Sequence, residues 1–136
     1  ILIDTNRNFL KLIDPRGSFG DFNIYGDDRY DYAKILHSIE GRYDLIIKDL
    51  FELDYDSKLN SFELSWTEDY NLNFIEIFLE TFDNINFEKL NEIRLIESLL
   101  FFTMIPLHEN NLKRQYAMLI IAIELLNSIA TQKLSI

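Results

Sequence analysis

The sequence predicts an α+β fold, in which an N-terminal β-hairpin and a second small hairpin pack on a mostly helical body. Two pairs of short β-prone runs, each pair flanking a turn-forming segment, predict the hairpins. Helical spacing of apolar residues over most of the remaining chain predicts the body. The length of 136 residues and the absence of any repeat or linker-like stretch indicate a single domain spanning 1–136.

The first hairpin is expected from residues 1–4 and 9–13, which a cluster of turn-forming residues separates. Pro15 ends its second strand, because proline has no amide hydrogen to give to a ladder and biases Asp14 towards an extended backbone. Residues 17–28 are rich in glycine and aspartate and are expected to form a loop.

The other expected elements are a second hairpin at 50–55 and 61–66 and helical segments at roughly 29–40, 73–82, 87–104 and 112–130. Gly41 is the predicted stop of the first helical segment. Asn86 is the predicted N-cap of the third, and Asn110 or Asn111 that of the fourth. The last segment is apolar nearly all round its axis, which predicts that it is buried.

Aspartate and glutamate outnumber lysine and arginine by 23 to 13, which gives a net charge of −10. Binding to a nucleic-acid backbone or to an anionic membrane surface needs a basic surface, so neither partner is expected. The chain has no cysteine, which excludes disulfides and thiolate metal sites and is typical of a reducing compartment such as the cytoplasm. Its longest apolar run, Tyr116–Ile123, is far too short to span a membrane.

The highest concentration of potential ligands lies within residues 9–38, which hold three glycines and five aspartates: Asp14, Asp21, Asp27, Asp28 and Asp31. Clustered carboxylates in a loop at the end of a strand suit hard cations such as Mg²⁺ or Ca²⁺. A solvated acidic loop explains the same composition. An EF-hand is excluded, because Tyr25 and Tyr32 stand at the fifth and twelfth positions of the loop that begins at Asp21, where that motif needs oxygen ligands.

The two histidines do not form a metal-binding pattern. His37 falls on or near the apolar face of the first helical segment, so we expect it to be packed and hydrogen-bonded rather than a ligand. His108 follows Pro106 in a loop and suggests no chemistry. The sequence also lacks a phosphate-binding loop of the G-x-x-x-x-G-K type and a G-x-S-x-G nucleophile turn.

Three segments, Leu12–Gly17, Ile24–Asp27 and Tyr30–Ser38, resemble the stretch that follows the catalytic loop in the aminoglycoside phosphotransferase-like kinase superfamily. In that superfamily a strand ends in Ile-Asp and is followed by a loop and by a helix that a Tyr-Asp pair leads. The likeness is strongest to bacterial members in capsule and surface-sugar gene clusters. Met104–His108 and Arg114–Met118 bear a weaker likeness to the C-terminal helices of the same proteins.

The resemblance implies roles for three residues. Asp14 matches the carboxylate that binds Mg²⁺ and so orients the phosphates of ATP or GTP, where the metal neutralises charge as the γ-phosphoryl leaves. Without the resemblance, Asp14 is a turn-forming aspartate before proline. Arg16 is expected to pair with a phosphate or with a neighbouring carboxylate. Asp31 matches the helix-leading aspartate, for which we expect a structural role in capping the helix.

The resemblance therefore implies the C-terminal lobe of a kinase-like fold. Its parent would be an ATP-dependent phosphotransferase acting on a hydroxyl of a sugar or small polar metabolite, in surface-polysaccharide biosynthesis, with the helices after residue 70 shaping the acceptor pocket. The chain begins at Ile1 in strand-like sequence and contains no His-x-Asp, so we expect the catalytic loop and N-terminal lobe to lie outside it, leaving no catalytic residue within 1–136. Two alternatives stay open: a non-enzymatic acidic helical module that meets a basic partner, and a degenerate kinase-like domain that binds without chemistry.

Overall fold

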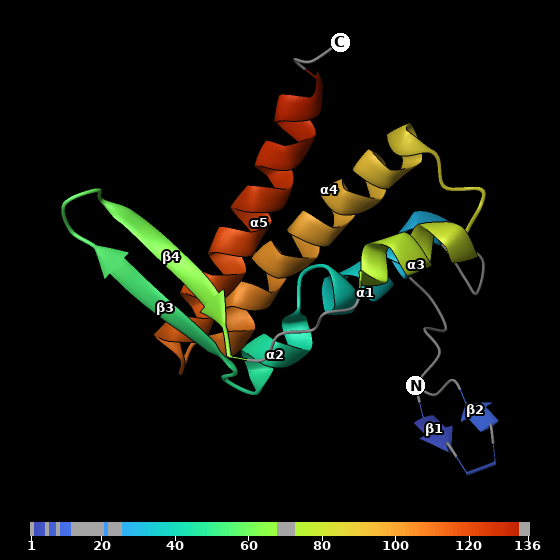
Figure 1. Ribbon diagram of the computed structural model, residues 1–136, viewed down its shortest axis with the longest axis horizontal. Helices are drawn as coiled ribbons and strands as arrows, with labels where there is room; N and C mark the ends of the chain where they lie inside the picture. The colour runs from blue at the N-terminus through green and yellow to red at the C-terminus, as the bar shows by residue number, and fades with distance from the viewer. Residues whose placement is uncertain are drawn as a thin grey trace.

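The computed structural model describes residues 2–4, 6–7, 9–11, 21, 26–67 and 73–133. In chain order its elements are β1 (Leu2–Asp4), β2 (Phe9–Lys11), α1 (Asp28–Ile39), α2 (Tyr43–Ile47), β3 (Phe51–Asp56), β4 (Ser61–Trp66), α3 (Phe74–Thr81), α4 (Phe87–Met104), the 3₁₀ helix η1 (Ile105–His108) and α5 (Leu112–Lys133). The fold is α+β, with two antiparallel hairpins and a helical body, as the sequence predicts (Figure 1).

The N-terminal hairpin pairs β1 with β2 in an antiparallel register that sets Leu2 opposite Lys11. Its turn is held by the Asp4 carboxylate, which accepts hydrogen bonds from the amides of Asn6 and Arg7 at 3.1 and 3.2 Å. The strand predicted over 9–13 is described as far as Lys11. In Figure 1 this hairpin lies apart from the helices, which differs from the predicted packing of both hairpins, whereas the second hairpin packs on them as predicted.

The second hairpin has one apolar face and one acidic face. Its apolar face consists of three directly opposed pairs, Phe51–Trp66, Leu53–Leu64 and Tyr55–Phe62. Because side chains alternate along a strand, the residues between them point to the other face, and these are Glu52, Asp54, Asp56, Ser61, Glu63 and Ser65. The turn is closed by the Asp56 carboxylate, which accepts the Lys58 amide at 2.7 Å.

Helix α4 is central to the body and packs against both α1 and α5 (Figure 1). On the α5 side the buried core consists of Ile46, Phe51, Phe101, Ala117, Met118, Ile121, Ala122 and Leu125. On the α1 side it consists of Ala33, Leu36, Phe78, Ile85, Leu90 and Ile93. The predicted caps are confirmed, because Asn86 accepts the Lys89 amide at 2.9 Å and Asn111 accepts the Arg114 amide at 3.1 Å.

Gly41 follows the end of α1, where the sequence predicts a stop. A Cβ atom built on Gly41 would lie 2.3 Å from Cε2 of Phe101, so the chain passes directly over that ring and has no room for a side chain. The left-handed backbone at this point belongs instead to Arg42, at φ 52°. Arg42 precedes the short helix α2, which the sequence analysis does not predict.

The prediction that the last helix is buried holds for one side of it only. Ala117, Met118 and Ile121 are buried against the core, but Leu112 and Ile123 are exposed. An apolar pattern over the whole circumference shows which sides of a helix are able to pack, and only tertiary structure decides which side is covered.

Candidate functional site

The two residues predicted to bind magnesium and nucleotide, Asp14 and Arg16, lie outside the described residues, so their roles stay predictions. Asp31 is described, and it is exposed in the first turn of α1. The predicted capping role is wrong, because the helix begins three residues earlier and Asp27 is its N-cap, accepting the Arg29 amide at 3.0 Å. The charge of Asp31 still favours the positive end of the helix.

A polar hollow lies where the N-terminal ends of α1 and α4 meet, and it is lined by Asp27, Asp28, Arg29, Asn86, Glu88, Lys89 and Glu92. Arg29 forms ion pairs with Asp27 and, at 3.0 Å, with Glu92. Lys89 pairs with Asp28 at 2.7 Å. These contacts lower the pKa of Asp27, chiefly through the hydrogen bond from Arg29, and raise that of Lys89 through the hydrogen bond to Asp28.

The aspartates of this hollow do not form a metal site. Within the described part of the chain, no group of three or more histidine, aspartate or glutamate side chains converges on one point. Asp27 and Asp28 are each neutralised by a cation, which leaves them poor ligands for Mg²⁺. Asp27 and Asp28 belong to the acidic segment predicted from the sequence, and in the structure they form ion pairs with neighbouring basic side chains.

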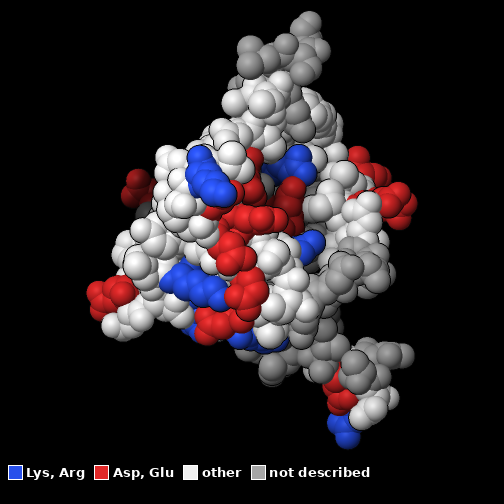
Figure 2. All heavy atoms as spheres, turned by 60° about the vertical axis from the view of Figure 1, so that its left-hand side comes forward, with Lys and Arg blue, Asp and Glu red and all other residues white. Residues whose placement is uncertain are grey.

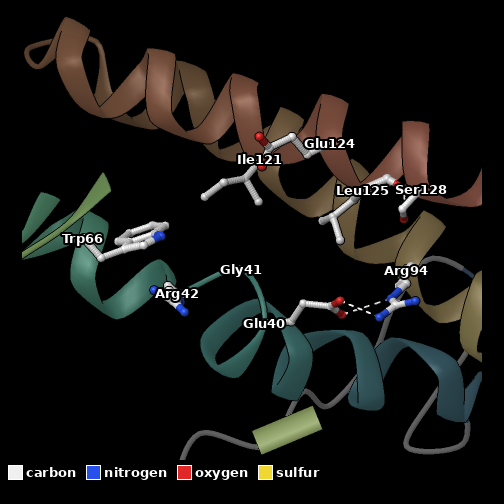
Figure 3. A pocket seen from close by; sticks show the side chains of 9 residues that line it. All are labelled: Glu40, Gly41, Arg42, Trp66, Arg94, Ile121, Glu124, Leu125 and Ser128. Carbon is white, nitrogen blue, oxygen red and sulfur yellow. Dashed lines mark hydrogen bonds and ion pairs between the residues drawn. The ribbon is translucent and has the colours of Figure 1, made fainter. Parts of the chain in front are cut away.

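A second hollow, the Trp66 cleft, lies at the opposite end of α1 and has a volume of about 440 Å³. Its lining residues are Glu40, Gly41, Arg42, Trp66, Arg94, Ile121, Glu124, Leu125 and Ser128 (Figure 3). Helix α1 has 12 residues and is therefore roughly 18 Å long, and this length separates the two hollows. The volume is within the range of pockets that hold small ligands.

The Trp66 cleft has a charged end and an aromatic end, as Figure 3 shows. At the charged end Arg94 binds the Glu40 carboxylate through two hydrogen bonds, of 2.6 and 3.1 Å. At the aromatic end the Arg42 guanidinium carbon lies 5.1 Å from the centre of the Trp66 ring. Such an arrangement offers both polar groups and an aromatic surface to a small polar ligand.

The charges of this cleft are unevenly satisfied. Glu40 and Arg94 neutralise one another, whereas Arg42 and Glu124 form no ion pair with any described residue.

Acidic side chains gather in a band on the face of the molecule that Figure 2 shows, with fewer basic ones among them, in keeping with the net charge of −10.

Glu97 is fully buried beside Gly41, and neither of its carboxyl oxygens has a hydrogen-bond partner among the described residues. Burial, and then the charge of Glu40, raise its pKa to about 9, although Arg94 favours the charged form. The Gly41 amide lies near the carboxyl but donates to the Leu36 carbonyl at 3.1 Å. Glu97 is therefore a protonated, neutral side chain at pH 7.

His37 is buried between two aromatic rings, with ring centres 4.5 Å from Tyr43 and 4.3 Å from Phe101. The predicted packing is confirmed, but its Nε2 atom has no hydrogen-bond partner among the described residues. Burial, and then the charge of Lys34, lower its pKa to about 4. His37 and Glu97 are thus both neutral at pH 7. His37 packs on the Phe101 ring, and Gly41 closely approaches both that ring and Glu97.

Glu97 and the Trp66 cleft are not among the sites predicted from the sequence. One signal for Glu97 was available, because it lies four residues after Ile93 and four before Phe101, and so on the buried stripe of α4. A carboxylate at such a position is either paired or neutral. The cleft itself joins residues from four segments of the chain, so no local pattern predicts it.

Comparisons with known proteins find no matching family model, no matching curated sequence and no matching solved structure. Within the described residues, none of the helices has the length and apolar character that crossing a membrane requires.

Proposed function

We propose that this chain is the C-terminal part of a kinase-like phosphotransferase, which moves the γ-phosphoryl of ATP or GTP to a hydroxyl of a sugar or small polar metabolite. The observation that supports the proposal is the order of the motifs along the chain between β2 and α1. The segment Ile13–Gly17 follows strand β2, and Tyr30 and Asp31 lie in the first turn of α1. A strand that ends in Ile-Asp, then a loop, then a helix led by Tyr-Asp is the order that the resemblance implies.

In this proposal Asp14 holds Mg²⁺ and Arg16 contacts a phosphate. Bound Mg²⁺ would neutralise charge on the phosphate oxygens. Asp27 and Asp28 are paired with Arg29 and Lys89, and the resemblance assigns the metal to Asp14. The surface-polysaccharide pathway is the setting that the resemblance implies for the acceptor.

The general base must come from outside residues 1–136, because the sequence contains no His-x-Asp. We therefore expect residues 1–136 by themselves to transfer no phosphoryl group from ATP to any sugar. Transfer above a protein-free blank by this chain would contradict that expectation.

The test is the substitution Asp14→Asn in the full-length polypeptide, with Mg²⁺–ATP and a panel of sugar acceptors. Loss of a metal ligand is expected to lower kcat by at least about 100-fold while the circular dichroism spectrum is unchanged. Asp21→Asn, seven positions further along the sequence, is the matched control and is expected to keep its activity. Retention of more than about a tenth of kcat by the Asp14 variant would refute the metal assignment.

The same experiment separates the alternatives. A full-length polypeptide that binds nucleotide through Asp14 without turnover is a degenerate kinase-like domain. A polypeptide that neither binds nor turns over nucleotide is an acidic interaction module. Either result rejects the phosphotransferase.

A further inference from the structure

The outer side of α5 carries an apolar stripe that the described elements leave partly or largely exposed: Leu112, Tyr116, Leu119, Ile123, Leu126 and Ala130. Successive helical residues are about 100° apart, so these six fall within an arc of about 80°. Leu112 is 63% exposed, Tyr116 38% and Ile123 44%, while the buried residues of α5 face the opposite way, into the core. No charged residue lies on the stripe.

The spacing of the stripe is that of a helix–helix seam. Its residues are separated alternately by four and three positions, which is the pattern of residues that interlock between two packed helices. The order of the intervals is the same from either end, so the stripe is symmetric about residue 121. In an antiparallel pair of α5 helices Leu112 would therefore meet Ala130, Tyr116 would meet Leu126 and Leu119 would meet Ile123.

We propose that α5 is the interface of a symmetric dimer, in which the stripes of two copies of this chain pack antiparallel about a two-fold axis at residue 121. A two-fold interface must complement itself, and the symmetric spacing meets that requirement without any further partner. A different helical partner would need no such symmetry.

Charge also favours a second copy at this surface. Each chain carries a net charge of −10, so two copies repel one another unless they meet where carboxylates are absent. The exposed face of β3–β4 bears Glu52, Asp54 and Glu63 and is unsuited to such contact. The stripe on α5 is free of acidic side chains, and its neighbour Lys113 already binds Glu52 within the same chain at 3.3 Å.

Two aromatic residues of the second hairpin extend the stripe. Phe62 stacks on Tyr116 with ring centres 5.3 Å apart, and Tyr55 adjoins Phe62 at 5.0 Å. Together with Leu112 and Ile123, these three aromatic residues make five large side chains that are each about half exposed. A fully exposed side chain of this size has a surface of roughly 200 Å², so the five present on the order of 500 Å² of apolar surface. A standard interface buries about 800 Å² on each partner, so we expect a dimer of micromolar affinity.

Sedimentation velocity of residues 1–136, from about 5 to about 500 µM, tests the proposal. The sedimentation coefficient is expected to rise with concentration towards that of a dimer, and Ile123→Lys is expected to raise the dissociation constant at least about tenfold. Ile77→Lys is the matched control, since Ile77 is 50% exposed on α3, remote from α5 (Figure 1), and it should dimerise as the wild type does. If Ile123→Lys fails to fold, Leu112→Lys replaces it.

A monomer over the whole range would overturn the proposal, and would mean that something other than a second copy covers α5. So would equal weakening by the α3 control, which would show association through charge or aggregation alone.

Cross-linking tests the antiparallel arrangement, because the chain has no native cysteine. Leu112→Cys and Ala130→Cys proteins are treated with a short bis-maleimide, each alone and as an equal mixture. The antiparallel pair places position 112 beside position 130 of the other copy and about 27 Å from position 112, so only the mixture should cross-link. Cross-linking of each variant alone would place each position beside its own copy, as in a parallel pair, and would refute the antiparallel arrangement.

Discussion

The charged and titratable side chains at the two ends of helix α1 lie in different environments. At the N-terminal end, Arg29 and Lys89 are paired with three carboxylates on the molecular surface. At the C-terminal end, the side chains of Glu97 and His37 are buried with polar atoms that have no partner among the described residues. The first end satisfies its charges in contact with water, whereas the second removes two titratable groups from water and neutralises them.

This difference predicts where the fold is sensitive. Surface ion pairs contribute about 0–1 kcal/mol each, because water and salt compete with them. A buried ionisable group instead makes the free energy of unfolding depend on pH, and close packing around it leaves little room for substitution. The C-terminal end of α1 should therefore dominate the response to mutation and to pH.

The largest effect is expected from Gly41→Ala. The new Cβ would lie 2.3 Å from Cε2 and 2.5 Å from Cζ of Phe101, whose ring is held in the core. Relieving that overlap must move α1 away from α4, so we expect the free energy of unfolding to fall by about 3 kcal/mol. Urea denaturation of the variant and the wild type measures it.

The control is Gly26→Ala near the other end of α1, where an added Cβ would meet no atom within 4 Å. That substitution should change the stability by less than about 0.5 kcal/mol. Equal losses at the two glycines would show that close packing at Gly41 is not the cause.

The next effect is a decline of stability as the pH rises between about 4.5 and 9, which depends on Glu97. The folded chain holds the Glu97 proton up to a pKa of about 9, whereas the unfolded chain releases it near the ordinary value of 4.5. The unfolded state therefore binds fewer protons between these values, and the free energy of unfolding falls as the pH rises. Glu97→Gln, which matches the protonated acid in shape, should remove this decline and be more stable than the wild type at pH 8 by about 2 kcal/mol.

His37 modifies the acid part of the same profile. Its pKa is about 4 in the folded chain and 6.5 ordinarily, so the unfolded state binds more protons between these values and stability falls as the pH drops. Between pH 4.5 and 6.5 the two groups oppose one another, and the wild type should be nearly independent of pH there. Thermal unfolding from pH 4 to 9 gives the profile, and a Glu97 variant that still loses stability above pH 6.5 would contradict the assignment.

Elements that depend on local interactions are predicted well from the sequence. Helix α4 is predicted over its whole length, because Asn86 caps it locally and Pro106 follows its end. The pairing of β3 with β4 follows from alternation and a turn, which are also local. The capping residue of α1 was misplaced by four positions, since Asp27 and Asp31 are equivalent in type and only the backbone distinguishes them.

What the sequence does not predict depends on distant contacts. The need for glycine at position 41 comes from Phe101, sixty residues away, and the neutrality of Glu97 comes from the elements that enclose it. The covered side of α5 is likewise decided by α4 and the second hairpin. The Trp66 cleft depends on the same long-range packing, whereas Asp14 and Arg16 rest on the motif alone.

The smallest effect is expected from the exposed ion pair between Lys89 and Asp28. Lys89→Gln should lower the free energy of unfolding by at most about 0.5 kcal/mol, and about 0.5 M salt should abolish the difference.

Arg94→Gln, at the other end of α1, is the comparison for this variant. It removes a part-buried contact of two hydrogen bonds to Glu40 and leaves that carboxylate beside Glu97. We therefore expect the free energy of unfolding to fall by about 2 kcal/mol, and salt should change this loss little. Urea denaturation at low and high salt compares the two. Similar losses with similar salt dependence would mean that the two ends of α1 do not differ in burial as described.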